Sequence, residues 1–174
     1  MRMVEVVPYQ AAWPTMFERL SAPLRRQLNG LIVAVHHVGS TAVEGLAAKP
    51  IIDIDVEMPD EGDFSAVVDS LASFGYVHVG DQGVVGREAF KRHGPTPMAH
   101  HLYVCRSGSD ELKRHLVFRD HLRTHRGDRD AYAAVKREAA SRFPHDIDGY
   151  LAHKGKIIQS IYVKCGLVPE EGML

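Results

Sequence analysis

The segment at residues 35–56, VHHVGSTAVEGLAAKPIIDIDV, restricts the possible folds of this chain more than any other part of its sequence. Its last part alternates apolar and acidic residues, and side chains along a strand alternate between the two faces. Asp53, Asp55 and Glu57 would therefore share one face, and the apolar residues between them would share the other. We predict a strand over residues 51–58 with a core face and an acidic face.

The acidic face of this strand suggests a metal site. Asp53 and Asp55 lie about 6 to 7 Å apart along an extended chain. Two carboxylates about 5 Å apart repel each other by roughly 3 kcal/mol at an effective dielectric constant near 20. A bound cation would remove this repulsion, so we predict that Asp53 and Asp55 are metal ligands.

The turn that precedes this strand suggests that a phosphate group binds beside the metal. Residues 32–38 are apolar and β-branched enough to form a strand, and they lead into Gly39, Ser40 and Thr41. The sequence that follows, AVEGLAAK, predicts a short helix at 42–49. The N-terminus of a helix presents unpaired N–H groups and a partial positive charge, both of which favour phosphate. We therefore predict that this turn binds an anion.

Length, composition and charge exclude several classes of protein. The chain has 174 residues, of which 45% are hydrophobic and 25% charged, as is usual for a globular protein, and we predict one domain over 1–174. A net charge of −1 without a long basic run argues against nucleic acid as the main partner. Cys105 and Cys165 lack CxxC spacing, so neither a disulfide framework nor a zinc ribbon is expected. No signal-peptide pattern and no apolar run of about 18 residues occur, so we predict a cytoplasmic protein without a membrane span.

The rest of the chain has most of its strands early and its helices late. Further strands are expected at 4–7, 76–79, 87–91 and 99–105. Helices are expected at 14–29, at 64–74, from a cap at Ser109 through Leu122, at about 128–143 and at about 146–165. Pro23 should kink or split the first of these helices. This order predicts an α+β fold with a small mixed sheet and a helical C-terminal layer.

On these residues the chain resembles the GrpB family, which is placed within the nucleotidyltransferase superfamily. The likeness covers nearly the whole length, from PYQAAWPTMFERL through HHVGSTAVEGLAAKPIIDIDV, HHLYV and FRDHLRTH to YAAVK and YLAHK. It implies a nucleotidyltransferase-like fold, in which a Gly-Ser turn holds a nucleoside triphosphate and two carboxylates on the next strand bind Mg²⁺. Gly39 and Ser40 match the first element, and Asp53 and Asp55 match the second.

One part of the superfamily pattern is missing. Active members usually carry a third carboxylate on a later strand, but the candidate strand at 99–105 contains neither Asp nor Glu. His101, or His100 beside it, would take that position. A neutral imidazole does not replace a carboxylate as a ligand of a second Mg²⁺, because hard cations prefer oxygen ligands.

The resemblance and the residues together predict a nucleotidyltransferase that moves a nucleotidyl group from a nucleoside triphosphate to a small acceptor. Asp53, Asp55 and His101 are the expected catalytic residues. The remaining candidates would hold the phosphates: Gly39, Ser40, Thr41, Lys49, Arg87, Lys136 and Lys154. Two of these lysines follow a tyrosine by four residues, as Tyr132 with Lys136 and Tyr150 with Lys154, so each pair shares a helix face.

Four alternatives remain open at this point. The fold could serve as a binding module without turnover, as the missing third carboxylate suggests, or as a protein-interaction adaptor. His121 and His125 have helical spacing near His115, which suggests a structural zinc site, but the glutamate of the HExxH motif and a partner cysteine are absent. A serine hydrolase would use Ser40, which lacks the G-x-S-x-G setting.

Overall fold

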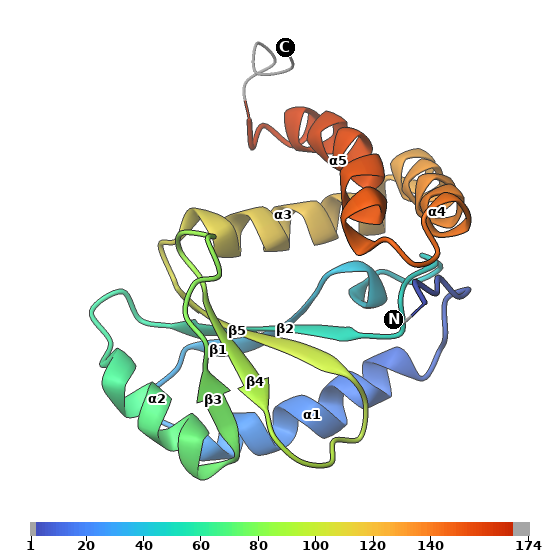
Figure 1. The fold of residues 1–174 in the computed structure, drawn as a ribbon. Helices are drawn as coiled ribbons and strands as arrows, with labels where there is room; N and C mark the ends of the chain where they lie inside the picture. Colours follow the sequence, from blue (N-terminus) through green and yellow to red (C-terminus); the bar gives the residue numbers. More distant parts are fainter. Residues whose placement is uncertain (1–2, 169–174) are drawn as a thin grey trace.

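The computed structural model describes residues 3–168, and a mixed five-stranded sheet lies between two layers of helices (Figure 1). The strands are β1 (Ala34–Val38), β2 (Ile52–Met58), β3 (Tyr76–His78), β4 (Glu88–Arg92) and β5 (His100–Arg106). The helices are α1 (Trp13–Gln27), α2 (Phe64–Ser73), α3 (Asp110–Thr124), α4 (Arg126–Arg142) and α5 (Ile147–Lys164). The ends of the predicted domain, 1–2 and 169–174, lie outside the described residues.

The strand order explains how residues far apart in sequence meet. Across the sheet the order is β1-β2-β5-β4-β3, with β2 and β5 parallel and the other neighbours antiparallel. The parallel pair requires a crossover, which α2, β3 and β4 supply between β2 and β5. The predicted α+β class with a mixed sheet is confirmed, and no helix within residues 3–168 is long and apolar enough to cross a membrane.

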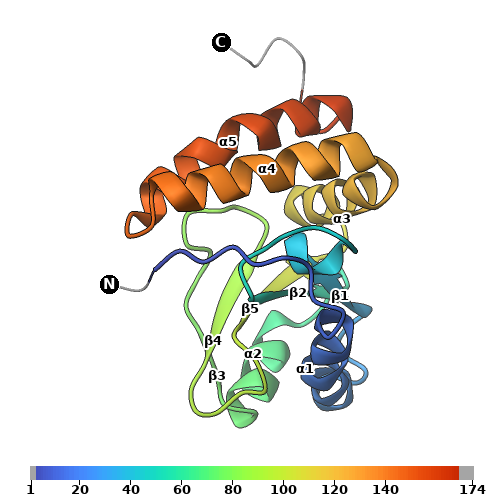
Figure 2. The same cartoon turned by 90° about the vertical axis from the view of Figure 1, so that its right-hand side faces the viewer.

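The two faces of β2 differ as its alternating sequence predicts. Ile52, Ile54 and Val56 are each 0% exposed and pack in the core that α1 and α2 build on one side of the sheet. The acidic residues face the other side, which α3, α4 and α5 cover (Figures 1 and 2). Burial of one such apolar side chain contributes roughly 1.5 to 3 kcal/mol, so this register is strongly favoured over a one-residue slip.

Helix α1 continues through Pro23, so of the two expected effects, a kink or a split, the split does not occur. A proline inside a helix removes one backbone hydrogen bond and costs about 3 kcal/mol in the absence of other contacts. Here Phe17, Leu20 and Leu24 form a buried stripe against the sheet. This tertiary packing holds the segment helical despite the proline.

The helix expected at 42–49 is absent, and only a three-residue 3₁₀ turn, Ser40–Ala42, follows β1. Gly45 has a φ of 79°, which is outside the helical region. Val43 and Leu46 are each 0% exposed and pack among the C-terminal helices, so this segment is a buried loop. This turn therefore has no α-helix N-terminus to bind phosphate, and that prediction is wrong.

The strand expected at residues 4–7 is reduced to one bridge. Val7 and Ala48 exchange backbone hydrogen bonds of 2.9 and 3.0 Å, and the N–H of Val4 donates to the carbonyl of Pro144 at 2.8 Å. The N-terminal segment therefore runs between the loop before β2 and the connection from α4 to α5 (Figure 2). It links the sheet layer to the helical layer without joining the sheet.

Candidate functional site

One small cavity brings together most of the residues predicted to form the site. Its volume is about 70 Å³, and we call it the lysine cavity. It is lined by Ser40, Thr41, Ala48, Lys49, Ile51, Asp53, His101, Lys136, Tyr150 and Lys154. The lining comes from the turn after β1, the segment leading into β2, strands β2 and β5, and helices α4 and α5. Seven of these ten residues are predicted site residues, and they come from segments up to 114 positions apart, from Ser40 to Lys154.

The parallel pairing of β2 with β5 sets His101 directly beside Asp53. His101 Nδ1 lies 2.9 Å from Asp53 Oδ1, and the two side chains are 50% and 31% exposed. His101 therefore lies on the neighbouring strand within hydrogen-bond distance of Asp53. His100 lies on the opposite face, where its Nε2 is 2.8 Å from the hydroxyl of Tyr76.

Gly39 is required for the approach of the Asp53 carboxylate. Gly39 has a φ of 70°, in the region that glycine tolerates and other residues rarely adopt. A Cβ atom at this position would lie 2.2 Å from Asp53 Oδ2. The absence of a side chain thus lets the backbone of the turn pack against the carboxylate.

Asp55 lies on the same face of β2 as Asp53, but it is buried and does not line the lysine cavity. Its Oδ2 atom is 2.7 Å from His115 Nδ1, and His115 Nε2 is 3.0 Å from Glu111 Oε1. Burial by itself would lower the pKa of His115, but hydrogen bonds and charges from Asp55 and Glu111 outweigh it and raise this pKa to about 9. An imidazolium ion therefore neutralises Asp55 at neutral pH.

Each acidic side chain on β2 has a histidine partner from a different element. Asp53 meets His101 of β5, Asp55 meets His115 of α3, and Glu57 meets His36 of β1 with 2.7 Å between Oε2 and Nε2. Burial would raise the pKa of Glu57, but the hydrogen bond from His36 lowers it below the ordinary value. Protonated His115 thus relieves part of the carboxylate repulsion that the sequence alone suggested a metal would relieve.

Lys136 is the most buried charged group of the cavity. It is 1% exposed, and its Nζ atom is 2.8 Å from the hydroxyl oxygen of Ser40. Burial, together with the charges of Lys154 and Arg137, lowers the pKa of Lys136 to about 6. Burial and the charge of Lys49 also lower the pKa of Lys154, to about 8. The cavity therefore holds amines whose protonated forms lack enough nearby negative charge to stabilise them.

Both lysines of the predicted Tyr-Lys pairs line the cavity, together with Tyr150 but not Tyr132. Lys136 Nζ is 4.4 Å from the centre of the Tyr132 ring, and Lys154 Nζ is 5.1 Å from the centre of the Tyr150 ring. Lys49 Nζ approaches the same Tyr150 ring at 5.5 Å. Cation–π contacts at these distances position the ammonium groups without supplying a full counter-charge.

Three arginines that were not among the predicted site residues bind the backbone of β1 and of the loop that follows it. Their guanidinium groups donate to backbone carbonyls, Arg119 to His37, Arg123 to Ala42 and Arg129 to Glu44. The bonds from Arg123 and Arg129 satisfy carbonyl groups that a helix at 42–49 would have paired internally. The spacing of Arg119 and Arg123, four residues apart on one helix, was the available signal.

Arg87, predicted to bind phosphate, does not line the lysine cavity. Its guanidinium lies over the Tyr103 ring, 4.3 Å from the ring centre, and it borders a separate pocket with Glu88 and Ser109. The sequence placed Arg87 near the site because it adjoins a glycine-rich segment. The register of β4 on β5 instead pairs Glu88 with Val104, which carries Arg87 away from Asp53.

The carboxylates near the cavity can hold a Mg²⁺ ion only when other oxygen atoms complete the coordination shell of the ion. Within residues 3–168 no group of three or more His, Cys, Asp or Glu side chains is arranged to hold a metal. Asp53 is the carboxylate that lines the cavity, and Asp55 Oδ1 is buried without a hydrogen-bond partner among the described residues. Mg²⁺ commonly binds through one or two carboxylates plus water and phosphate oxygens, which matches this pair.

The histidines considered for zinc have other partners. The rings of His121 and His125 stack with 3.8 Å between their centres, and His121 Nε2 is 2.6 Å from Asp128 Oδ2. His115 is held between Asp55 and Glu111. The three histidines therefore do not converge on one point.

Comparison with known proteins gives consistent matches over nearly the whole chain. The family model described as "GrpB protein" matches residues 3–164. UPF0157 protein YqkA of Bacillus subtilis (strain 168) is 33% identical over 159 residues, which cover 91% of this chain and 46% of that protein. The crystal structure of conserved protein GrpB from Enterococcus faecalis has 33% identity and a TM-score of 0.78, covering 92% of this chain and 98% of that one.

A further match concerns part of a larger enzyme. A dephospho-CoA kinase of Mycolicibacterium paratuberculosis is 28% identical over 185 residues, covering 91% of this chain and 45% of that protein. This chain therefore spans about half the length of two of the relatives it matches.

Gly39→Ala is expected to destabilise the fold more than Gly30→Ala. Both glycines have positive φ, so each alanine costs roughly 1 to 2 kcal/mol in backbone strain. Only the alanine at position 39 would also displace the Asp53 carboxylate, because the space beside Gly30 is open. Urea unfolding of the two variants measures the difference, and equal losses would contradict the close packing of Gly39 on Asp53.

Lys136→Met is expected to be more stable than the wild type near pH 6.5, with an advantage that shrinks toward pH 9.5. The folded pKa of about 6 lies below the ordinary lysine pKa near 10.4, so between these values the unfolded chain binds one more proton. The stability of the wild type therefore rises with pH across this window, by up to about 1.4 kcal/mol per pH unit. Urea unfolding at several pH values measures it, with exposed Lys156→Met as the control. A pH-independent difference between Lys136→Met and wild type would be the contrary result.

Proposed function

This chain belongs to the GrpB family, and we propose that it binds a nucleoside triphosphate by its phosphates and transfers a nucleotidyl group to a small acceptor. The proposal includes membership of the nucleotidyltransferase superfamily, which the Gly-Ser turn and the paired aspartates suggest. The observation that carries it is the convergence of Lys49, Lys136 and Lys154 on one cavity that also contains Ser40 and Asp53.

The lysine cavity suits a phosphate group in both charge and size. Desolvation of an amine is costly unless a counter-charge accompanies it. Asp53 is the one carboxylate among the lining residues, and three lysines share the cavity with it. A phosphate group would supply the missing negative charge, and its binding would raise the pKa of Lys136 and draw a proton onto its amine.

His101 is suited to act as the general base. Asp53 Oδ1 accepts a hydrogen bond from His101 Nδ1, which fixes the tautomer with the proton on Nδ1. The other ring nitrogen, Nε2, is then free to accept the proton of an attacking hydroxyl group. His101 is half exposed, so an acceptor molecule has access to it from solvent.

Mg²⁺ is part of this proposal, and Asp53 with Asp55 Oδ1 would hold it together with phosphate oxygens. When bound, the ion would polarise a phosphoryl oxygen and offset the charge that develops during transfer. The lysines orient the phosphate chain, and Gly39 keeps the backbone of the turn close to Asp53. The name of one relative, a dephospho-CoA kinase, adds support, because kinases as a class bind nucleoside triphosphates.

A second candidate function is binding of the same ligand without turnover. The observation that favours it is the ion pair of Asp55 with His115, which leaves Asp53 as the only acidic side chain lining the cavity among the described residues. Release of pyrophosphate from a nucleoside triphosphate, assayed across hydroxyl and amine acceptors, distinguishes the two. Tight binding with no release would favour the second candidate.

Lys154→Gln is expected to weaken nucleotide binding at least tenfold, because it removes one ammonium group from the lysine cavity. Titration calorimetry with each of the four ribonucleoside triphosphates in Mg²⁺ measures the affinity. Lys156→Gln is the matched control, since Lys156 is exposed on the same helix and does not line the cavity. The proposal would be overturned by failure of all four nucleotides to bind the wild type, or by equal affinity in Lys154→Gln.

Mg²⁺ with nucleotide is expected to raise the melting temperature of the wild type, and Asp53→Asn should abolish most of the rise. A ligand at 100 times its dissociation constant stabilises by about 2.7 kcal/mol, or about 5 to 10 °C for a domain of this size. Thermal unfolding in Mg²⁺ and in chelator measures the effect. Asp69→Asn, on the opposite side of the sheet, is the control and should respond like the wild type. Identical melting of wild type with Mg²⁺ and with chelator, with and without nucleotide, would refute the metal site.

A further inference from the structure

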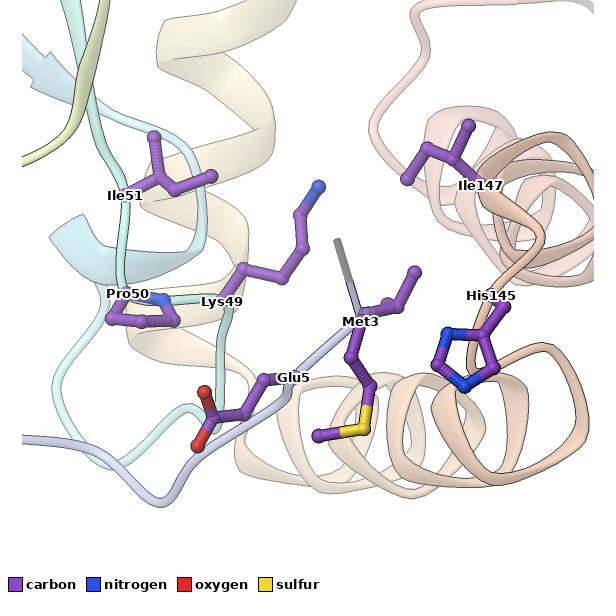
Figure 3. Close-up of a pocket in the computed structure, with 8 residues that line it drawn as sticks. Met3, Glu5, Lys49, Pro50, Ile51, His145 and Ile147 are labelled. Atoms are coloured by element: carbon purple, nitrogen blue, oxygen red, sulfur yellow. The ribbon is translucent and has the colours of Figure 1, made fainter. Parts of the chain in front are cut away.

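A second, larger cavity adjoins the lysine cavity. Its volume is about 340 Å³, and we call it the apolar cavity. It is lined by Met3, Val4, Glu5, Lys49, Pro50, Ile51, His145 and Ile147 (Figure 3). Three separate parts of the chain build it: the N-terminal segment, the residues leading into β2, and the connection between α4 and α5 with the start of α5.

Lys49 and Ile51 line both cavities, so the two spaces meet at this short segment. The ammonium group of Lys49 is 5.5 Å from the centre of the Tyr150 ring, and Lys154 approaches the same ring at 5.1 Å. In Figure 3 the Lys49 side chain extends toward the space between Ile51 and Ile147. One cation therefore stands at the junction of a polar and an apolar space.

The two cavities differ in size, so each would hold a different part of one ligand. The lysine cavity, at about 70 Å³, accommodates a phosphate group but not a nucleoside. The apolar cavity, at about 340 Å³, lies within the range of small-molecule sites, roughly 300 to 1,000 Å³. Apolar side chains are accessible at its walls, since Met3 is 58% and Ile147 is 42% exposed. A flat organic group would cover this surface.

Charge fixes the direction in which a ligand would lie. The lysine cavity contains three lysines, whereas the apolar cavity has the carboxylate of Glu5 on its wall. A phosphate chain would be repelled at the Glu5 end and attracted at the Lys49 end. An uncharged ring system with polar edges suits the apolar cavity, because Glu5 and His145 offer hydrogen-bonding groups beside the apolar wall.

We propose that the apolar cavity binds the base and ribose of the nucleotide whose phosphate chain enters the lysine cavity, with Lys49 beside the phosphate nearest the sugar. This inference rests on the proposed function, since it assigns the organic part of the same ligand. It predicts that much of the affinity comes from the nucleoside. Inorganic tripolyphosphate therefore binds the wild type at least tenfold more weakly than ATP.

The test compares ATP with inorganic tripolyphosphate by titration calorimetry in Ile147→Asn. Ile147 begins α5 and is partly exposed, so the substitution changes the wall of the apolar cavity without opening the core. ATP affinity is expected to fall at least fivefold while tripolyphosphate affinity stays unchanged. Leu151→Asn is the matched control, since Leu151 is 45% exposed on the same helix and does not line the apolar cavity.

A second readout does not depend on a variant. Photolabelling of the wild type with 8-azido-ATP should modify peptides that contain residues 3–5, 49–51 or 145–147. Labelling elsewhere, or equal affinity of the wild type for ATP and tripolyphosphate, would overturn this inference and leave phosphate binding in place. If neither ATP nor tripolyphosphate binds, the proposed function itself fails, and the inference fails with it.

Discussion

The pairing of each carboxylate on β2 with a histidine is the interaction on which the rest of the structure depends. Asp55 is the extreme case, because it is 0% exposed and would be an uncompensated buried charge without His115. Breaking a buried ion pair by removing one partner typically costs about 3 to 5 kcal/mol. Since His115 belongs to α3 and also contacts Glu111, this pair fixes the helix above the acidic face of the sheet. The exposed pair of Asp53 and His101 extends the same arrangement to the lysine cavity.

This pairing decides the charge of the cavity. The acidic side chains of β2 are paired with histidines, and among the residues that line the lysine cavity Asp53 is one carboxylate against the three lysines Lys49, Lys136 and Lys154. The resulting surplus is positive, which favours an anionic ligand over a metal ion bound by the protein alone. For this reason we propose that Mg²⁺ binds together with a phosphate group.

Sequence reasoning succeeded where the physical signal was local. The alternation of β2 and the cap at Ser109 of α3 both follow from patterns a few residues long. It failed at 42–49, where good helix formers occur but Gly45 and the arginines of α3 and α4 favour a loop. It also failed for Arg87, because a glycine-rich neighbourhood does not reveal the register of β4 on β5.

The sequence by itself determined which residues share a face, since a strand has a period of two and a helix places residues four apart together. Asp53 with Asp55, and Tyr150 with Lys154, could be grouped on that basis alone. The tertiary structure decided which of these faces meet. Ser40 and Lys136 are 96 residues apart, and Asp55 and His115 are 60 apart. No local pattern encodes such contacts, because they depend on the parallel register of β2 with β5 and on the packing of the C-terminal helices over the acidic face.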